Sequence, residues 1–168
     1  MTWTPHVTVA AIAEQDGRFL LVEERVRGVL VINNPAGHLE EAESFAAAVR
    51  RETLEETGWE FEPQAITGIY LWKNSRRSAT FLRVAFSGRC LRHHPDRPLD
   101  QGIVGPRWLT RAELGDGTHQ LRSPLVIRCI DDYLLGRYYP LDILTSILQK
   151  DPLLKDVELA GIRPRSSA

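Results

Sequence analysis

The chain has 168 residues, a formal net charge of -1, and 43% hydrophobic and 26% charged residues. These values are typical of one ordinary folded domain, and the nearly neutral charge gives no indication of a nucleic-acid or membrane-surface partner. Cys90 and Cys129 are the two cysteines, without CxxC spacing, which argues against a disulfide framework or a zinc ribbon. The N-terminus lacks a signal-peptide pattern and no run approaches 18 apolar residues. We therefore expect a cytoplasmic protein without a membrane segment.

The first third of the chain predicts strands followed by a helix. Residues 6–14 and 18–25 are rich in β-branched and apolar residues and flank the turn at 15–17, so we expect a β-hairpin. A third short strand follows within residues 28–37 and leads into a Pro–Gly loop. Residues 42–57 then predict a helix, with Gly58 at the position of a C-terminal glycine.

The remaining elements repeat this order. Residues 65–73 and 79–89 predict two strands, and residues 93–105 predict a loop that contains His93 and His94. A short strand and a short helix follow, with Thr110 as the expected N-cap of that helix. A second long helix is predicted for residues 123–137, with Ser123 as its cap and Pro124 in its first turn.

Strands, helix, strands, helix is an order that predicts an α+β fold with a mixed sheet between helices. We expect a single domain over residues 1–148. A less regular C-terminal tail is expected over residues 149–168.

The first predicted helix carries an unusual group of carboxylates. Glu52, Glu55 and Glu56 are spaced i, i+3 and i+4, which places them on one stripe of the helix. The apolar end of the same stripe is formed by Phe45, Ala48 and Val49. Three neighbouring carboxylates repel one another, and Arg51, which can reach Glu55, cannot neutralise all three. Clustered oxygen ligands without sulfur indicate a site for Mg²⁺ or Mn²⁺, and the alternative is a solvated acidic face.

The spacing around this helix matches the Nudix box, G-x5-E-x7-R-E-U-x-E-E-x-G-U, where U is a bulky apolar residue. The matching positions are Gly37, Glu43, Arg51, Glu52, Thr53, Glu55, Glu56, Gly58 and Trp59. Every fixed letter matches, and Thr53 stands where Leu, Ile or Val is usual. The chain thus resembles the Nudix hydrolase superfamily. That resemblance implies an α/β/α sandwich, a loop–helix–loop box, and cleavage of a phosphoanhydride in a nucleoside diphosphate-linked substrate.

The resemblance also assigns roles to residues of the box. It implies that Glu52 and Glu56 bind Mg²⁺ or Mn²⁺ directly and that Glu55 does so directly or through water. The backbone carbonyl of Gly37 is a further implied ligand. The remaining two box residues, Glu43 and Arg51, are implied to orient the helix and its carboxylates. Hydrolysis then proceeds by attack of a metal-activated water on phosphorus.

Outside the box, the segments "PHVTVA", "NPAGHLE", "FLR", "RW", "LRSPLV" and "YPL" are similar to the NudJ type of bacterial Nudix phosphatases. They span most of residues 5–143. This resemblance implies removal of the terminal phosphate from nucleoside tri- and diphosphates, and from the pyrophosphate ester of the thiamine pyrimidine precursor, with release of orthophosphate. The alternatives are a nucleotide-sanitising pyrophosphohydrolase that releases pyrophosphate, and a non-catalytic nucleotide-binding module.

The residue that acts as general base is less clearly marked. Many Nudix enzymes carry a catalytic carboxylate six residues before the Trp of the "RW" strand, but here that position is Gly102. Asp100 is the nearest acid and reaches the site if the loop bulges, and Glu55 is the alternative. The two neighbouring loop histidines are more typical of a solvent-exposed loop.

Candidate substrate contacts lie on the strands that follow the box. Arg83, within the shared "FLR", suits a terminal phosphate, and a cross-strand ion pair is the alternative. Lys73 and Arg25 are further candidate phosphate contacts. Trp72 shares a strand face with Tyr70 and is a candidate for stacking on a base, with core packing as the alternative. The expected partner is a small nucleoside phosphate, and the chain is a monomer or a homodimer.

Overall fold

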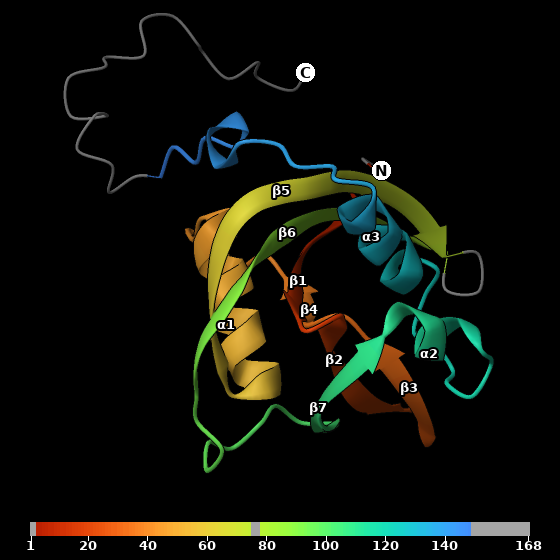
Figure 1. Cartoon of the computed structure of the whole chain (residues 1–168). Helices are drawn as coiled ribbons and strands as arrows, with labels where there is room; N and C mark the ends of the chain where they lie inside the picture. The colour runs from red at the N-terminus through yellow and green to blue at the C-terminus, as the bar shows by residue number, and fades with distance from the viewer. Residues whose placement is uncertain (1–2, 75–77, 149–168) are drawn as a thin grey trace, which may run out of the picture.

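The computed structural model describes residues 3–74 and 78–148, so the predicted tail at 149–168 lies outside the described residues. Figure 1 shows the elements in chain order. They are β1 (His6–Gln15), β2 (Arg18–Val26), β3 (Val29–Asn33), β4 (Ala36–His38), α1 (Phe45–Thr57), β5 (Trp59–Asn74), β6 (Ala79–His93), β7 (Ile103–Thr110), α2 (Arg111–Gly115), α3 (Leu125–Leu134) and a 3-10 turn, η1 (Leu141–Ile143).

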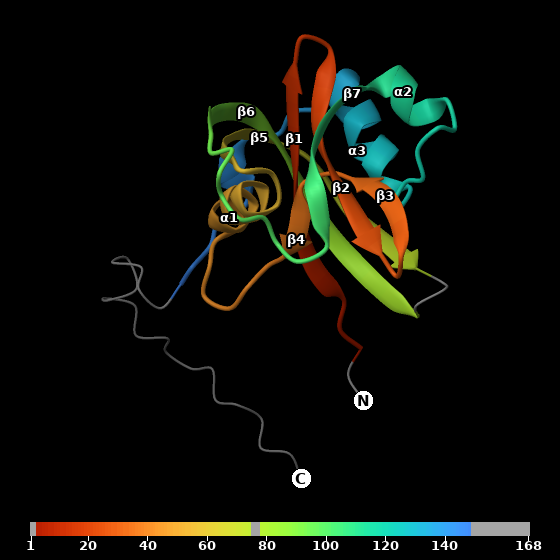
Figure 2. The same cartoon turned by 90° about the horizontal axis from the view of Figure 1, so that it is seen from below.

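A mixed sheet forms the centre of the molecule. Its strand order is β3-β2-β1-β6-β5, with β4 paired to β1 and β7 paired to β2. Strands β1 and β6 run parallel, whereas β1 is antiparallel to both β2 and β4. Helix α1 covers one side of the sheet and α3 the other, as Figures 1 and 2 show from two directions. This arrangement confirms the predicted α+β class and the α/β/α sandwich, and β1 and β2 form the predicted hairpin.

The central strand β1 is buried on both faces because helices cover both sides of it. Its Val9 and Ala11 belong to one core cluster together with Ala48 and Val49 of α1. The alternate residues Ala10 and Ile12 pack in a second cluster that includes Val126, Cys129 and Ile130 of α3. Successive side chains of a strand point to opposite faces, and both faces of β1 are covered. The sequence of β1 is therefore a nearly continuous run of apolar residues.

Helix α1 has defined ends, and these ends fix where its carboxylates lie. The Ser44 side chain caps the N-terminus by accepting from the backbone N–H of Ala47 at 3.1 Å. Gly58 ends the helix in the left-handed region, with φ 71°, and its N–H donates to the carbonyl of Leu54. Thr53, the one departure from the box pattern, is fully buried, and its hydroxyl donates to the Val49 carbonyl at 2.7 Å.

Three details of the predicted elements need correction. Strand β5 begins at Trp59 rather than at residue 65, and β6 extends to His93. The His93 ring therefore belongs to a strand rather than a loop, and it stacks on the Trp59 ring with centroids 4.6 Å apart. Helix α3 begins at Leu125, after Pro124, without a side-chain cap, so Ser123 is not its N-cap. The Thr110 cap of α2 is confirmed and forms a capping box with Glu113.

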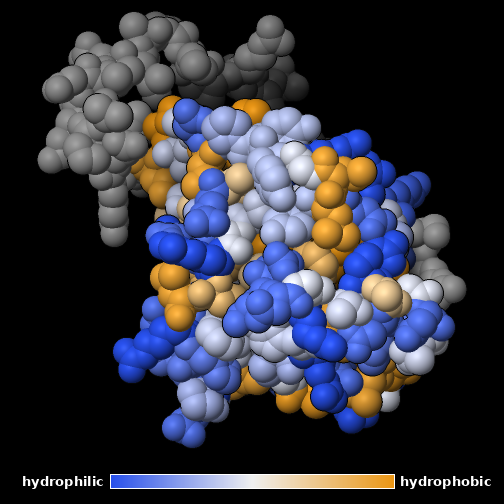
Figure 3. All heavy atoms as spheres, in the orientation of Figure 1, coloured by the Kyte–Doolittle hydropathy of each residue, from blue (hydrophilic) through white to orange (hydrophobic). Residues whose placement is uncertain are grey.

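The surface has no continuous apolar band on the face shown in Figure 3, where apolar patches alternate with polar side chains. Among the described residues, no helix combines the length and the apolar character that crossing a membrane requires.

Candidate active site

Three carboxylates meet at the C-terminal end of α1. Glu52, Glu55 and Asp100 each offer an oxygen, and these oxygens all lie within 4.8 Å of one another. Glu52 is buried, Glu55 is half-buried and Asp100 is exposed. The sequence predicted the two glutamates together from their helical spacing, and the structure adds the aspartate from a segment more than 40 residues later in the chain.

The loop after β6 brings Asp100 to this cluster. The backbone N–H of Asp100 donates to the carbonyl oxygen of Glu55 at 3.1 Å, and the Asp100 carbonyl accepts from Ile103 at 3.0 Å. Gly102, where a carboxylate was expected, has φ 89° and its carbonyl accepts from the N–H of Arg25 at 2.7 Å. Asp100 thus reaches the site from two residues earlier, and Gly102 provides the backbone conformation of the turn.

The fourth carboxylate of the group, Glu56, lies deeper in the protein. Its Oε2 accepts from the backbone N–H of Ala36 at 2.8 Å. Burial raises the pKa of Glu56 to about 8; the Ala36 hydrogen bond opposes this rise, and the nearby charges of Glu52, Glu24 and Asp100 add to it. Burial also raises the pKa of Glu52. Burial thus disfavours the charged form of both Glu52 and Glu56 in the absence of a cation.

Gly37 lies directly against the carboxylate of Glu52. A Cβ added at Gly37 would stand 2.0 Å from the Glu52 carboxyl carbon, which leaves room for no side chain. Strand β4 holds this position because Gly37 pairs with Val9 of β1. The close approach explains why glycine occupies this position of the box.

Arg51 binds the carboxylates from the outside of the cluster. Its guanidinium donates to both oxygens of Glu43, at 3.1 and 2.7 Å, and to Glu52 at 2.7 Å and Glu55 at 3.1 Å. A further bond reaches the carbonyl of His38 at 3.0 Å. Hydrogen bonds from Arg51 lower the pKa of Glu43. One fork of donors thus fixes three glutamates relative to the β4 backbone, in agreement with the orienting role that the box implied for Glu43 and Arg51.

A small polar pocket of about 130 Å³ opens on the other side of Gly37. Arg83 of β6 lines it and is 8% exposed. Its Nη1 donates to the side chain of Asn34 in a long contact of 3.5 Å, and no carboxylate forms an ion pair with it in the described part of the chain. Burial lowers the pKa of Arg83 because a charged guanidinium is costly away from water. The cross-strand ion pair considered as an alternative is therefore absent among residues 3–74 and 78–148.

The same pocket contains buried polar atoms that lack a hydrogen-bond partner among the described residues. They are Thr8 Oγ1, Asn33 Oδ1, Arg83 Nε and Ser123 Oγ. Each buried polar group without a partner costs about 1–3 kcal/mol. A pocket with so many of them, next to a buried cation, suits a polar anionic ligand.

Comparison with known proteins agrees with this geometry. The profile of the Nudix domain family matches residues 3–128. The chain is 39% identical over 140 residues to "Phosphatase NudJ" of Escherichia coli K12, covering 83% of this chain and 90% of that protein. A solved Nudix hydrolase from Nitrosomonas europaea has 49% identity and a TM-score of 0.83, covering 86% of this chain and 98% of the other. A MutT Nudix hydrolase from Burkholderia pseudomallei, at 19% identity and a TM-score of 0.65, shares the fold.

The chain belongs to the Nudix family. It is a Nudix hydrolase, an enzyme that acts on phosphoanhydrides. The box residues occupy one site, formed by α1, the preceding β4 and the loop that carries Asp100.

Two predicted substrate contacts of this Nudix hydrolase do not lie in the polar pocket. Arg25 is exposed, and its side chain makes a contact of 3.4 Å with the carbonyl of Gly28. Its neighbour Glu24 lines the pocket. Because successive side chains of a strand point to opposite faces, the Arg25 side chain lies on the other face of β2. Lys73 is also exposed and lines a separate, larger cavity next to the pocket.

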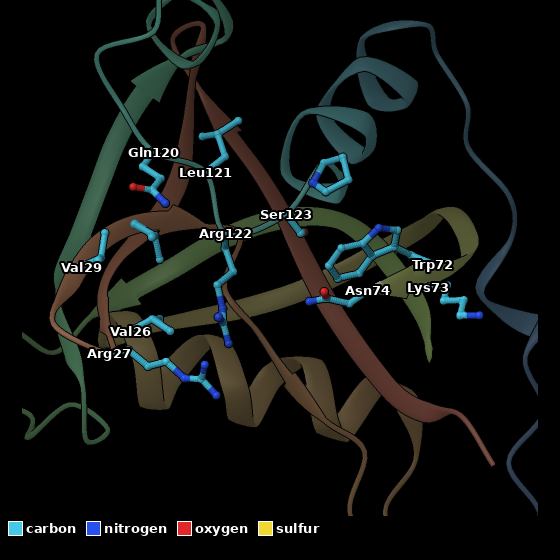
Figure 4. A pocket seen from close by; sticks show the side chains of 12 residues that line it. Val26, Arg27, Val29, Trp72, Lys73, Asn74, Gln120, Leu121, Arg122 and Ser123 are labelled. Carbon is cyan, nitrogen blue, oxygen red and sulfur yellow. The ribbon is translucent and has the colours of Figure 1, made fainter. Parts of the chain in front are cut away.

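That larger cavity has a volume of about 590 Å³ and is shown in Figure 4. Trp72 lines both the cavity and the polar pocket, so the predicted stacking residue stands at their boundary. One face of its ring stacks on Phe81, with centroids 5.7 Å apart. Tyr70 instead packs towards α3, where its hydroxyl donates to Asp132 at 3.0 Å, so Tyr70 belongs to the core.

The sequence reasoning missed several polar residues of the pocket. Thr8 and His38 were not predicted, and they lie beside the predicted Arg83 across β1, β4 and β6, because Thr8 pairs with both His38 and Arg83. Asn33 and Arg122 also line the pocket, and Arg122 is 3.2 Å from Glu24. Strand register brings Thr8, His38 and Arg83 together, and the N–H of Arg122 donates to the carbonyl of Ile32 in β3, which places the segment before α3 beside the pocket. The shared segments "NPAGHLE" and "LRSPLV" were a signal for part of this set.

The donor set fits a divalent cation, which Nudix hydrolases generally use. Glu52, Glu55 and Asp100 offer oxygen ligands alone, without sulfur or imidazole nitrogen, which is the chemistry of Mg²⁺ and Mn²⁺ sites. Burial is the main cause of the raised pKa of Glu56, and a cation in this place would favour its charged form.

Proposed function

We propose that this enzyme hydrolyses the terminal phosphoanhydride bond of nucleoside tri- and diphosphates in a reaction that depends on Mg²⁺ or Mn²⁺, and that it releases orthophosphate. The observation that carries the proposal is the position of Gly37. One side of Gly37 contacts the carboxylate of Glu52, and the residue also lines the pocket that contains Arg83. A site for a cation and a site for a phosphate thus lie next to one another.

The cation would be held by oxygen ligands, which are the carboxylates of Glu52, Glu55, Glu56 and Asp100 and the backbone carbonyl of Gly37. A bound divalent cation would supply charge neutralisation at the phosphoryl oxygens and would acidify a water molecule. Arg51 keeps Glu52 and Glu55 in position through the hydrogen bonds described above. Removal of that guanidinium would leave neighbouring carboxylates to repel one another.

The protein groups have distinct roles in the proposed reaction. Arg83 binds the terminal phosphate, because a buried guanidinium without a carboxylate partner among the described residues gains an ion pair when an anion enters. Asp100 or Glu55 accepts the proton of the attacking water, since both carboxylates belong to the cluster and are partly accessible.

Support for orthophosphate release comes from the relatives named Phosphatase NudJ. The pyrophosphate ester of the thiamine pyrimidine precursor is a further candidate substrate. Because the described chain keeps every box carboxylate, turnover is favoured over a purely nucleotide-binding role. We also predict that the protein is located in the cytoplasm and is a monomer or a homodimer. A small nucleoside phosphate is its predicted partner.

Product analysis tests the proposal. The protein is incubated with a nucleoside triphosphate and Mg²⁺, and orthophosphate and pyrophosphate are measured separately. We expect equal amounts of orthophosphate and nucleoside diphosphate at early times. Pyrophosphate and nucleoside monophosphate as the only early products would overturn the proposal and favour the pyrophosphohydrolase. A Glu56→Gln variant that retained full turnover would instead show that hydrolysis does not use this cluster.

A further inference from the structure

Two hairpins in this sheet use the same two-residue turn with different residues. The β1–β2 hairpin closes with Asp16 and Gly17, at φ 53° and 76°. The β2–β3 hairpin closes with Arg27 and Gly28, at φ 51° and 84°. Positive φ at both central positions is the requirement of a type I′ turn, which favours Asn-Gly and Asp-Gly. The first turn has a preferred pair, whereas the second has arginine in a backbone conformation that arginine rarely adopts.

A strained residue that the fold does not need suggests a role for its side chain. Arg27 is exposed and forms no hydrogen bond or ion pair within the described part of the chain. Neither folding nor a surface ion pair therefore accounts for an arginine in this turn. Asp16, in the equivalent position of the other hairpin, lies away from the site, beside a shallow hollow with Trp59 and Trp108.

The Arg27 side chain borders the 590 Å³ cavity next to the polar pocket. The described residues that line this cavity include Arg27, Lys73 and Arg122 but no Asp or Glu. In Figure 4 the side chains of Arg27 and Arg122 both extend into the lower part of the cavity, whereas that of Lys73 extends away from Trp72 and the cavity. The Trp72 ring lies across from the two guanidinium groups, on the β5 side.

The cavity is continuous in its lining with the proposed phosphate site. Trp72, Asn74, Arg122 and Ser123 line both the cavity and the polar pocket. A volume of 130 Å³ suits a phosphoryl group, whereas 590 Å³ falls within the range of sites for small organic molecules, about 300–1,000 Å³. A ligand that places its terminal phosphate beside Arg83 would therefore extend its remaining part into the cavity.

We propose that the cavity binds the leaving part of a nucleoside triphosphate, with Arg27 and Arg122 on its remaining phosphates and Trp72 against its base. This inference rests on the proposed function and specifies its substrate. Arg122 is also 3.2 Å from Glu24 of the neighbouring pocket, whereas Arg27 has no carboxylate partner among the described residues. The cavity therefore favours a leaving part that carries negative charge of its own. Arg27 is then a specificity residue for the triphosphate over smaller pyrophosphates, which do not reach the hairpin.

The variant Arg27→Asn separates binding from folding, because asparagine is a favoured residue in this turn. We expect the melting temperature to stay the same or rise. The KM for a nucleoside triphosphate should rise by roughly three- to tenfold, with kcat changed less than twofold, since an exposed guanidinium–phosphate contact is lost. The KM for inorganic pyrophosphate should not change. The dissociation constant of a nucleoside diphosphate analogue with a methylene group in place of the bridging oxygen, which the enzyme cannot hydrolyse, should rise by the same factor as the KM when it is measured by calorimetry with Mg²⁺.

Two matched controls belong to this experiment. Arg92→Asn removes an equal charge at a separate hollow near His94 and should leave both KM values unchanged. Asp16→Asn exchanges one favoured turn residue for another and should leave kinetics and melting temperature unchanged. An unchanged triphosphate KM in Arg27→Asn, or an equal rise for inorganic pyrophosphate, would overturn the inference. Absence of orthophosphate release by the unaltered enzyme would contradict the proposed function, while diphosphate binding would still report on the cavity.

Discussion

The backbone N–H of Asp100 donates to the carbonyl oxygen of Glu55, so the loop after β6 is attached to the last turn of α1. This bond places two carboxylates from distant parts of the chain in one cluster with Glu52. Many Nudix enzymes have a catalytic carboxylate at the position of Gly102. Here Asp100, two residues earlier in the same loop, reaches the site instead. The two carboxylates are the two candidates for the general base.

Substitution of each candidate base by its amide identifies the base. An Asn or Gln side chain at that position cannot accept the proton of the attacking water. We expect one of Asp100→Asn and Glu55→Gln to lower kcat by about 10²- to 10⁴-fold, which is the range of general-base contributions. The measurement is kcat for orthophosphate release at saturating Mg²⁺. Asp96→Asn, in the same loop but outside the cluster, is the control, and equal full activity of all three variants would exclude both bases.

Glu56→Gln tests whether the buried carboxylate serves the metal rather than the fold. The amide oxygen of glutamine can still accept the N–H of Ala36, and a neutral amide avoids the cost of burying a carboxylate in the absence of a cation. We expect the metal-free variant to melt at the same or a higher temperature than the unaltered protein. The stabilisation that Mg²⁺ gives to the unaltered protein should be lost. A large loss of metal-free stability in scanning calorimetry would instead indicate a structural role.

Arg51→Lys tests the guanidinium as the organiser of the site. Lysine keeps the charge but cannot donate in parallel to Glu43, Glu52 and Glu55, as Arg51 does. We expect a loss of about 1–3 kcal/mol in the free energy of unfolding, from hydrogen bonds to charged groups. Affinity for Mg²⁺ should fall as well. Urea unfolding measures the first quantity and calorimetric titration the second, and an unchanged result in both would remove the proposed role.

Asp132, which lies outside the active site, should make the stability of the protein depend on pH. Burial alone would raise the pKa of Asp132, but hydrogen bonds from Arg128 and Tyr70 and the charges of Arg128 and Arg137 lower it below its usual value. A depressed folded-state pKa gives stability that is fully present above the unfolded pKa, about 3.9, and is lost as the pH falls through the folded value. Asp132→Asn should therefore reduce stability near neutral pH by about 1–3 kcal/mol.

The same variant should lose less stability than the unaltered protein when the pH falls below about 4. Urea midpoints measured between pH 7 and pH 2.5 check both statements. Asp142→Asn, at an exposed position, is the control and should follow the unaltered protein. If the urea midpoints of Asp132→Asn and of the unaltered protein changed in parallel with pH, the proposed role of Asp132 and its arginine partners would be contradicted.

The sequence was sufficient to predict the helical part of the site because helical spacing is regular. Positions i, i+3 and i+4 place Glu52, Glu55 and Glu56 on one stripe without any knowledge of the fold. The orienting role of Glu43 and Arg51 was implied by the resemblance to the box, and the two side chains are hydrogen-bonded in the structure. The sandwich fold and both long helices were also predicted, although with ends that differ by a few residues.

The other parts of the site depend on strand register and on loop conformation, which the local sequence does not determine. Arg25 was predicted as a phosphate contact, but the single-residue alternation of a strand places its neighbour Glu24 at the pocket. The pairing of Thr8 with Arg83 arises from two parallel strands separated by most of the domain. Ser123 resembled a helix cap by its position before Pro124, whereas the structure buries its hydroxyl in the pocket without a partner among the described residues.

Binding of Mn²⁺ to the metal-free protein tests the central claim most directly, since electron paramagnetic resonance distinguishes bound from free Mn²⁺. The unaltered protein should bind Mn²⁺, Mg²⁺ should displace it, and Glu52→Gln should weaken the binding at least tenfold while the circular dichroism spectrum stays unchanged. Equal Mn²⁺ affinity of the two proteins would contradict the account, because the cluster formed by Glu52, Glu55 and Asp100 would then not be the metal site.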